Sequence, residues 1–225
     1  MVVTHWILFV LPFAFHLGQP ERVVEKAEAR SQVSFQMVNS MPADPPSARI
    51  SYGPNALQFA ELRLSEGDGP WPVAIVIHGG CWLSKYADLN YTRPMASALC
   101  KRGFATWNIE YRRADNDGGG WPETFLDVAR AADHLREIAG AQRLYLNRVI
   151  TVGHSAGGHL AAWLAARHRL KTESPLYSGD PLKIHAVVSL AGIGDLGAFV
   201  SEDPESCGFG VFKLLGGKPD EVPDR

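Results

Sequence analysis

The chain of 225 residues contains few cysteines and almost no net charge. Cys81, Cys100 and Cys207 are too few and too scattered to predict a disulfide framework, so we expect reduced thiols. No C-x-x-C spacing indicates a zinc site. The 22 lysines and arginines are balanced by 24 acidic residues, which leaves no basic surface field for a phosphate backbone. We therefore expect no metal site and no nucleic-acid partner.

Long hydrophobic runs are also scarce. Residues 2–15 are almost wholly apolar, but a helix that spans a membrane needs roughly 20 such residues, so we predict no transmembrane span. The segment has the length of a secretory hydrophobic region, yet no Lys or Arg precedes Trp6 and the nearest A-x-A pattern is at residues 27–29. Two locations stay open, the cytoplasm or export by a weak N-terminal signal, and the sequence does not predict whether residues 1–29 are cleaved. The alternative to a signal is an apolar N-terminal helix that docks on the domain or results from the choice of start site.

Three prolines between residues 40 and 47 indicate a linker, because proline lacks a backbone donor and disfavours a helix. We therefore divide the chain into an apolar N-terminal segment with a proline-rich linker, residues 1–48, and a single domain, residues 49–225. Hydrophobic residues make up 46% of the chain, enough for a sizeable core.

Strands and helices alternate in the predicted domain. Short apolar runs at residues 72–77, 104–109, 148–152 and 186–190 are typical of strands buried on both faces of a parallel sheet. Helical patterns lie between them at residues 95–102, 122–139 and 155–168. This order predicts an α/β fold with a doubly wound, mostly parallel sheet.

The strongest motif lies between the third of these strands and the helix after it. Gly153-His154-Ser155-Ala156-Gly157 fits G-x-S-x-G in the strand-turn-helix context of a nucleophile elbow. The serine backbone in such a turn is strained, and side chains two positions away would collide with neighbouring elements, which explains the two glycines. Ser155 is the predicted nucleophile, and the Ala156 amide at the helix N-terminus would face the substrate oxygen. The alternative is a glycine-rich turn without chemistry, but the phosphate-binding glycine patterns are absent.

A second loop indicates the same reaction. His78-Gly79-Gly80-Cys81-Trp82 follows the first core strand, and its glycines allow the amides of Gly80 and Cys81 to turn toward an oxyanion. Both loops follow parallel strands, which end at one edge of the sheet. Taken alone, a His-Gly-Gly turn is as often a purely structural turn as it is part of an active site. We disfavour the Cys81 thiol as a nucleophile, because nothing nearby in sequence would lower its pKa.

Several other residues permit two interpretations. Trp82 and Trp121 either line the substrate pocket or pack in the core. Glu110, Arg112 and Arg113 either brace the glycine-containing loop through ion pairs or are solvated. The acidic, glycine-rich stretch at residues 115–120 lacks the ligand spacing of a calcium-binding EF-hand, so we interpret it as a loop near the pocket.

Four segments together make the chain resemble the α/β-hydrolase superfamily. They are residues 78–82, 108–113, 118–122 and 153–159, and the resemblance covers about residues 50–225. Within the superfamily the chain looks like the HGG-type esterase branch, with the bacterial esterases related to kynurenine formamidase and feruloyl esterase. The resemblance implies a hydrolase of small carboxylic esters or aryl amides that is acylated on Ser155 and needs no cofactor. It also implies an oxyanion hole formed by the amides of Gly80, Cys81 and Ala156.

The chain departs from the superfamily's pattern in two catalytic residues, because neither the histidine base nor the acidic residue is found at a suitable position. In this superfamily an Asp or Glu and then a His follow the serine along the chain. His159, His168 and His185 follow Ser155, but each is poorly placed, and we expect packing or surface roles. Asp195 follows a strand, whereas the resemblance places the acid after a further strand. We therefore expect a chain truncated before its last strands, with acid and base beyond residue 225, an unpaired sheet edge and weak or no activity.

Two further classes of function remain open. A binding protein with the α/β-hydrolase fold could keep the elbow without turnover. An aminopeptidase-type serine hydrolase would share the elbow but would need a charged site for the peptide terminus. The sequence predicts neither the substrate nor the oligomeric state.

Overall fold

The computed structural model describes residues 33–202 and 204–225. The apolar segment at residues 2–15 and the pattern at residues 27–29 lie outside the described residues. In the part that is described, no helix has both the length and the apolar character needed to cross a membrane. The sheet and its helices belong to a compact unit from Phe35 to Arg225.

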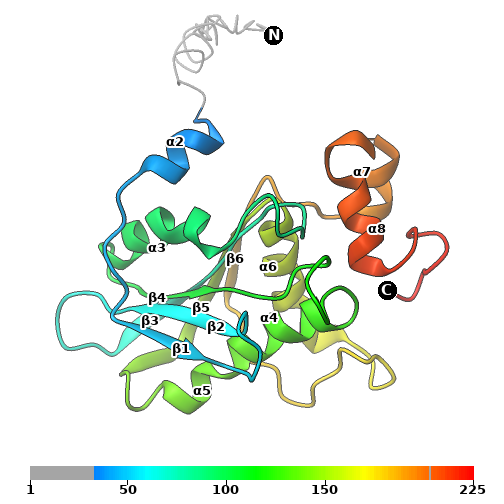
Figure 1. Cartoon of the computed structure of the whole chain (residues 1–225). Helices are drawn as coiled ribbons and strands as arrows, with labels where there is room; N and C mark the ends of the chain where they lie inside the picture. The colour runs from blue at the N-terminus through cyan, green and yellow to red at the C-terminus, as the bar shows by residue number, and fades with distance from the viewer. Residues whose placement is uncertain (1–32, 203) are drawn as a thin grey trace, which may run out of the picture. The chain divides into compact units, whose positions relative to one another are not determined.

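A six-stranded sheet forms the centre of this unit, in the order β1-β2-β4-β3-β5-β6 (Figure 1). Its strands are β1 (Ala48–Ser51), β2 (Phe59–Arg63), β3 (Trp71–Ile77), β4 (Ala105–Ile109), β5 (Leu144–His154) and β6 (Ala186–Leu190). The last four strands are mutually parallel, whereas β1 and β2 are antiparallel to their neighbours. The predicted α/β class with a mostly parallel sheet is confirmed.

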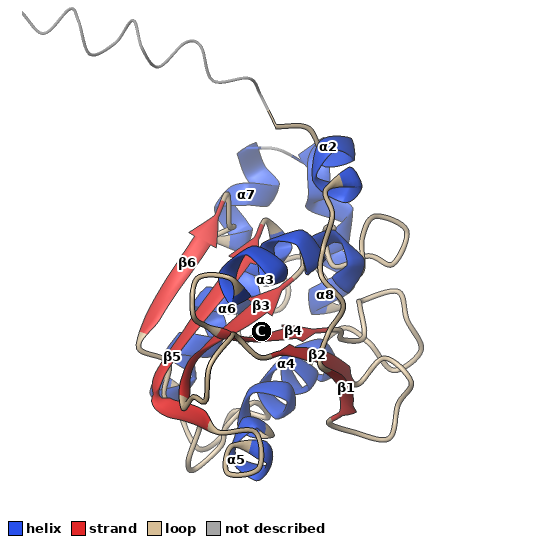
Figure 2. Cartoon of the chain, turned by 90° about the vertical axis from the view of Figure 1, so that its left-hand side faces the viewer, coloured by secondary structure: helices blue, strands red, loops and turns tan. Residues whose placement is uncertain are grey.

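Helices cover both faces of the sheet (Figures 1 and 2). On β4, Trp107 donates to the carbonyl of Ala131 in α4, whereas the next residue, Asn108, bonds to Thr92 just before α3. Because side chains alternate along a strand, α4 and α3 lie on opposite faces. The helices are α2 (Phe35–Ser40), η1 (Leu89–Thr92), α3 (Arg93–Cys100), α4 (Glu123–Asp133), α5 (Leu135–Ile138), α6 (Ala156–Ala166), η2 (Arg167–Arg169), α7 (Leu196–Glu202), η3 (Pro204–Gly208) and α8 (Phe209–Leu215).

The strands differ sharply in burial. Residues 73–77 of β3 have no exposed surface, as expected for a strand covered on both faces. By contrast, every residue of β6 is exposed, and among the described strands β6 pairs only with β5. Within the described residues, β6 is therefore an apolar strand at the side of the sheet with one unpaired edge, as expected from the sequence.

The structure differs from the sequence prediction in one helix and in the linker. The helix predicted at residues 122–139 is divided into α4 and α5, with His134 between them. The predicted linker packs on the domain, because the Ser47 amide bonds to the carbonyl of Leu62 and the Asp44 amide bonds to Ser97. The compact unit accordingly begins at Phe35, before the boundary predicted at residue 49.

Candidate active site

Ser155 lies in a strained turn between β5 and α6. Its φ and ψ are 53° and −122°, a combination that is unusual for a residue with a side chain. A Cβ atom on Gly153 would lie 2.1 Å from the carbonyl oxygen of Gly157, and one on Gly157 would lie 2.2 Å from that of Ile77. Both collisions are the ones that the sequence predicted. The turn is therefore possible only with glycine at these two positions.

The second predicted loop, residues 78–82, lies directly against this turn, and we call it the glycine loop. A Cβ atom on Gly79 would lie 2.5 Å from the His154 carbonyl oxygen and 3.3 Å from Cβ of Ser155. Ser155 is itself partly exposed. The serine and the glycine loop thus share the edge at which the parallel strands end.

Three amides near this edge take no part in the hydrogen bonds of the described fold. Within residues 33–202 and 204–225, the amides of Gly80, Cys81 and Ala156 donate no hydrogen bond to another protein group. Gly80 and Cys81 both have positive φ, 99° and 51°, which turns the peptide planes away from regular structure. Ala156 begins the 11-residue helix α6, whose N-terminus carries partial positive charge. An anionic oxygen near Ser155 would find donors here.

A buried ion network supports the base of the glycine loop. The Glu110 carboxylate, with the residue only 2% exposed, accepts from Nε2 of His78 at 3.1 Å and from Arg113 at 2.9 Å. It also accepts from the amides of Leu89 and Tyr111. Burial alone would raise the pKa of Glu110, but His78 and Arg113 outweigh burial and hold the pKa below its usual value. Glu110 and Arg113 therefore brace the loop, the first of the two interpretations above.

Arg112 takes part in a different network. Its guanidinium pairs with the buried carboxylate of Asp127 and with Glu123 on α4. Gln58 donates to the same Asp127 at 2.6 Å. These contacts join the loop after β4 to helix α4 and do not reach the glycine loop.

The histidines after Ser155 occupy the packing and surface positions that were expected. His159 lies edge-on to Trp82 and Phe125, and burial lowers its pKa to about 4. His168 is exposed, and His185 pairs with Val149 at the amino end of β6. Among the described residues, no histidine or carboxylate forms a hydrogen bond with the Ser155 hydroxyl.

Asp195 has a local structural role. Its carboxylate accepts a hydrogen bond from the Ala198 amide at 2.9 Å, which is the contact of a helix cap at the start of α7. Its side chain is exposed. This position gives no support to Asp195 as a catalytic acid.

The prediction of reduced thiols is wrong for two of the three cysteines. Cys81 and Cys207 form a disulfide, with Cα atoms 5.3 Å apart, and Cys100 is free. The partners are 126 residues apart in sequence, so only the fold brings them together. Spacing rules for disulfides could not identify this pair.

The two tryptophans differ in exposure. Trp82 is 0% exposed and belongs to the core, so the core alternative describes it and the predicted substrate contact is not available to it. Its side chain points away from solvent because the strained loop places it beside His159 and the start of α6. Trp121 is partly exposed and packs edge-on against Phe125 at the border of the core.

One residue near the serine was missed by sequence reasoning. The Tyr91 hydroxyl lies 3.1 Å from Nδ1 of His154, the residue that precedes Ser155. Burial lowers the pKa of His154, which favours its neutral form. Tyr91 in turn stacks on Phe35 of α2 at 4.8 Å. A single tyrosine in a loop carries no sequence signal for such a contact.

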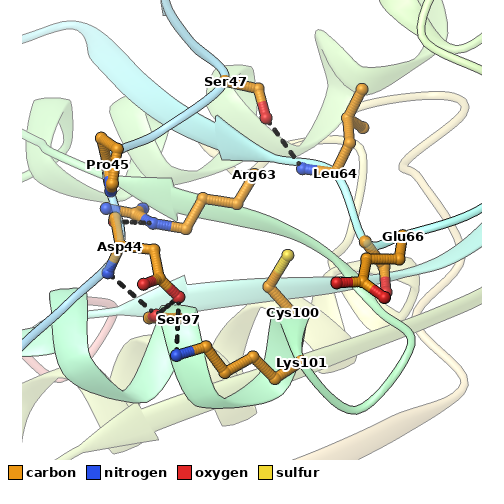
Figure 3. Close-up of a pocket in the computed structure, with 10 residues that line it drawn as sticks. Asp44, Pro45, Ser47, Arg63, Leu64, Glu66, Ser97, Cys100 and Lys101 are labelled. Carbon is orange, nitrogen blue, oxygen red and sulfur yellow. Dashed lines mark hydrogen bonds and ion pairs between the residues drawn. The ribbon is translucent and has the colours of Figure 1, made fainter.

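A cavity of about 390 Å³ lies near the amino ends of the parallel strands, opposite the ends that carry Ser155 and the glycine loop (Figure 3). It contains Arg63, which is in register with Thr106 near the start of β4, and Cys100 and Lys101 at the end of α3. Ser155 instead follows the carboxyl end of β5. This cavity is therefore separate from the candidate active site. Elsewhere in the described ranges, no cluster of three or more His, Cys, Asp or Glu residues has the arrangement to hold a metal ion.

Comparison with known proteins gives the family. The model of the BD-FAE family matches residues 63–225, which is most of the chain. The chain belongs to the BD-FAE family. This assignment places it in the α/β-hydrolase superfamily, in agreement with the sheet order and the elbow.

Curated relatives share a smaller part of their length. "Esterase LipC" of Mycobacterium tuberculosis is 30% identical over 151 residues, which cover 64% of this chain and 36% of that protein. "Probable carboxylic ester hydrolase LipM" of the same organism is 27% identical over 154 residues, 65% of this chain and 34% of that protein. The chain thus spans about a third of the length of these relatives.

Solved structures share the fold of this BD-FAE chain. Esterase B from Lactobacillus Rhamnosis (HN001) superposes with a TM-score of 0.68 at 21% identity, covering 90% of this chain and 66% of that one. A truncated form of a carbohydrate esterase from gut microbiota gives a TM-score of 0.64 at 22% identity, covering 80% and 71%. At these identities the likeness concerns the fold alone.

Proposed function

We propose that the chain is a serine hydrolase of the HGG-type esterase branch, which cleaves small carboxylic esters or aryl amides through an acyl-enzyme on Ser155. One observation carries the proposal. The strained turn of Ser155 abuts the glycine loop, with three unbonded amides beside it. The BD-FAE match and the relatives named as esterases support the same reaction class.

The proposed chemistry follows from these groups. Oγ of Ser155 forms a bond to the substrate carbonyl carbon and gives up its proton, while the carbonyl oxygen becomes an oxyanion. The amides of Gly80, Cys81 and Ala156 donate to that oxyanion, the type of contact that often contributes most to such catalysis. The C–O or C–N bond to the leaving group then breaks, and the leaving group takes a proton. Water attacks the acyl-enzyme in the same way and releases the acid. The partly exposed Trp121 borders the substrate in this proposal.

The rate depends on a general base. A serine hydroxyl without a base is a poor nucleophile at neutral pH, and removal of triad members leaves only about 10³–10⁴-fold acceleration over water. His159 is packed between aromatic rings and His185 lies at the opposite end of β6, so neither serves Ser155. We expect hydrolysis of an activated aryl ester by this chain within that residual range.

Covalent labelling tests the proposal. A fluorophosphonate probe should label the purified chain slowly, and mass spectrometry should locate the adduct on Ser155. The Ser155→Ala variant should lose the label, whereas Ser201→Ala, a change at an exposed serine on α7, should keep it. Label that persists in Ser155→Ala, or a wild-type chain that takes no label, would reject Ser155 as the nucleophile.

A binding protein without turnover is the second candidate. It is favoured by the finding that the Ser155 hydroxyl has no histidine or carboxylate partner among the described residues. The two candidates differ in one measurement. A non-catalytic protein would bind an ester or its amide analogue reversibly, with equal affinity in wild type and in Ser155→Ala, and would form no adduct.

A further inference from the structure

The Cys81–Cys207 disulfide joins the glycine loop to the C-terminal helices. Cys81 contributes one of the three unbonded amides, and Cys207 lies in η3, directly before α8. Cys81 is partly exposed and Cys207 is 9% exposed, so the bond lies close to the surface beside the elbow. The bond therefore reaches a residue to which the proposed function gives a role.

Helix α8 is a firm anchor for this bond. Val211, Leu214 and Leu215 are buried in the core, and the amide of Trp121 donates to the Leu214 carbonyl at 2.7 Å. Gly210 packs so closely on the loop that a Cβ atom there would lie 2.3 Å from the carbonyl oxygen of Cys81. Cys207 is thus attached to a packed element, and its bond can restrain Cys81.

The glycine loop needs such a restraint. Gly80, Cys81 and Trp82 have positive φ in succession, and this conformation is unfavourable for the two residues with side chains. On the other side, Trp82 is held by its burial and by its carbonyl, which accepts from the Ala114 amide. The amide of Cys81 donates no hydrogen bond to any group in the described part of the chain. Its direction depends on the neighbouring packing and on the covalent bond of its own side chain.

We infer that Cys207 is a positioning residue, whose disulfide with Cys81 orients the Cys81 amide toward the oxyanion. The inference rests on the proposed function, since it assigns the amide to that reaction. A dithiol reductant breaks the S–S bond by two successive thiolate attacks, which leave two cysteine thiols and an oxidised, cyclic reductant. After this reduction the loop can leave its strained conformation, and acylation of Ser155 becomes slower. The disulfide thus makes reactivity depend on the redox state.

The test compares labelling rates of Ser155 in oxidised and reduced protein. The Cys100→Ser chain is used as the background, so that the Cys81–Cys207 pair supplies the only thiols formed. Dithiothreitol treatment and, separately, the Cys207→Ser substitution should each lower the second-order rate of fluorophosphonate labelling about 10-fold or more, since loss of a whole oxyanion donor costs about 10²–10³-fold. Reoxidation with oxidised glutathione should restore the rate in the Cys100→Ser chain and not in the chain that also carries Cys207→Ser.

Hydrogen exchange provides a readout independent of reactivity. Reduction should speed amide exchange in a peptide covering residues 79–83 by a larger factor than exchange in β3, where buried amides report the stability of the whole fold. Equal labelling rates in both redox states, with Ser155→Ala unlabelled, would overturn the inference and leave the proposed function standing. An increase in β3 as large as the increase at residues 79–83 would show that the bond stabilises the whole fold and does not position the loop, and it would also overturn the inference. If no state is labelled, the proposed function fails, and exchange at residues 79–83 alone decides whether the bond positions the loop.

Discussion

Gly157 lies at a point of the elbow where there is no space for a methyl group. A Cβ atom there would lie 2.2 Å from the Ile77 carbonyl oxygen and 2.5 Å from that of His78, and backbone atoms of β3 cannot move aside. We expect Gly157→Ala to lower the free energy of unfolding by about 1–3 kcal/mol, as overpacked sites do. Urea denaturation measures this. Gly140→Ala is the matched control, because a Cβ there meets nothing within 4 Å, and equal stability of the two variants would contradict the elbow geometry.

Glu110 is the centre of the network below the glycine loop. Glu110→Gln leaves Arg113 buried with a neutral partner, and breaking a buried ion pair typically costs about 3–5 kcal/mol. Glu221→Gln breaks an exposed contact with Lys218 and should cost less than about 1 kcal/mol. Denaturation midpoints of the two variants give the comparison. A Glu110→Gln chain as stable as Glu221→Gln would show that the network does not stabilise the fold.

His159 makes stability depend on pH. Burial lowers its pKa in the folded chain to about 4, whereas an unfolded histidine titrates near 6.5, so the unfolded chain binds more protons between these values. Stability from the neutral ring is complete above about pH 6.5 and decreases as the pH falls toward 4, by about 3 kcal/mol at most. His159→Phe should flatten this part of the profile of thermal midpoints against pH. His168→Phe, at an exposed position, should not, and a parallel loss in both variants would refute the assignment.

The residues found from sequence and those missed differ in the range of the contacts involved. Ser155 and its two glycines were predictable because an elbow is a local turn with a fixed spacing. Cys207 and Tyr91 were not, because their partners are 126 and 63 residues away and only the fold brings them together. Trp82 was ambiguous for the same reason, since it is buried beside His159 of α6, which is 77 residues away in the sequence.

At the level of elements, β6 is the weak point of the sheet. Val187, Val188 and Leu190 are 37%, 41% and 43% exposed, and an apolar edge strand is a template for association with other chains. We expect concentration-dependent self-association of the chain, visible by light scattering. Val188→Lys should reduce it, because charge on an edge strand opposes pairing. Thr172→Lys adds the same charge in an exposed loop, and an equal effect of both changes would attribute solubility to net charge instead.

Strands with an apolar sequence pattern were predicted, whereas a strand that carries charged side chains was missed. The four parallel strands were each indicated by a short apolar run, although the run at residues 148–152 covers only part of β5 (Leu144–His154). β2 was missed because Glu61 and Arg63 interrupt its pattern, although both side chains are buried. The structure explains this burial by their mutual ion pair and by Arg93, which pairs with Glu61 from α3. Helix α8 was missed because its seven residues are too few for a clear helical period.

At the level of the whole molecule, the disulfide should contribute measurably to stability. It closes a long loop, and such bonds typically stabilise a protein by about 2–4 kcal/mol by restricting the unfolded chain. We expect dithiothreitol to lower the urea midpoint of the Cys100→Ser chain accordingly, and to leave a Cys207→Ser, Cys100→Ser chain unchanged. A midpoint that is insensitive to the reductant in both chains would mean that the bond is absent in solution.

The same bond encloses β4, α4, β5, α6 and β6 in one covalent ring. A peptide bond cut inside that ring opens it without releasing a fragment, whereas a cut before residue 81 or after residue 207 frees a piece at once. Protein cut once inside the ring would therefore migrate as a single species on a non-reducing gel. It would separate into two fragments only after reduction of the disulfide. Limited proteolysis can thus distinguish a cut between residues 81 and 207 from a cut outside this range by size alone.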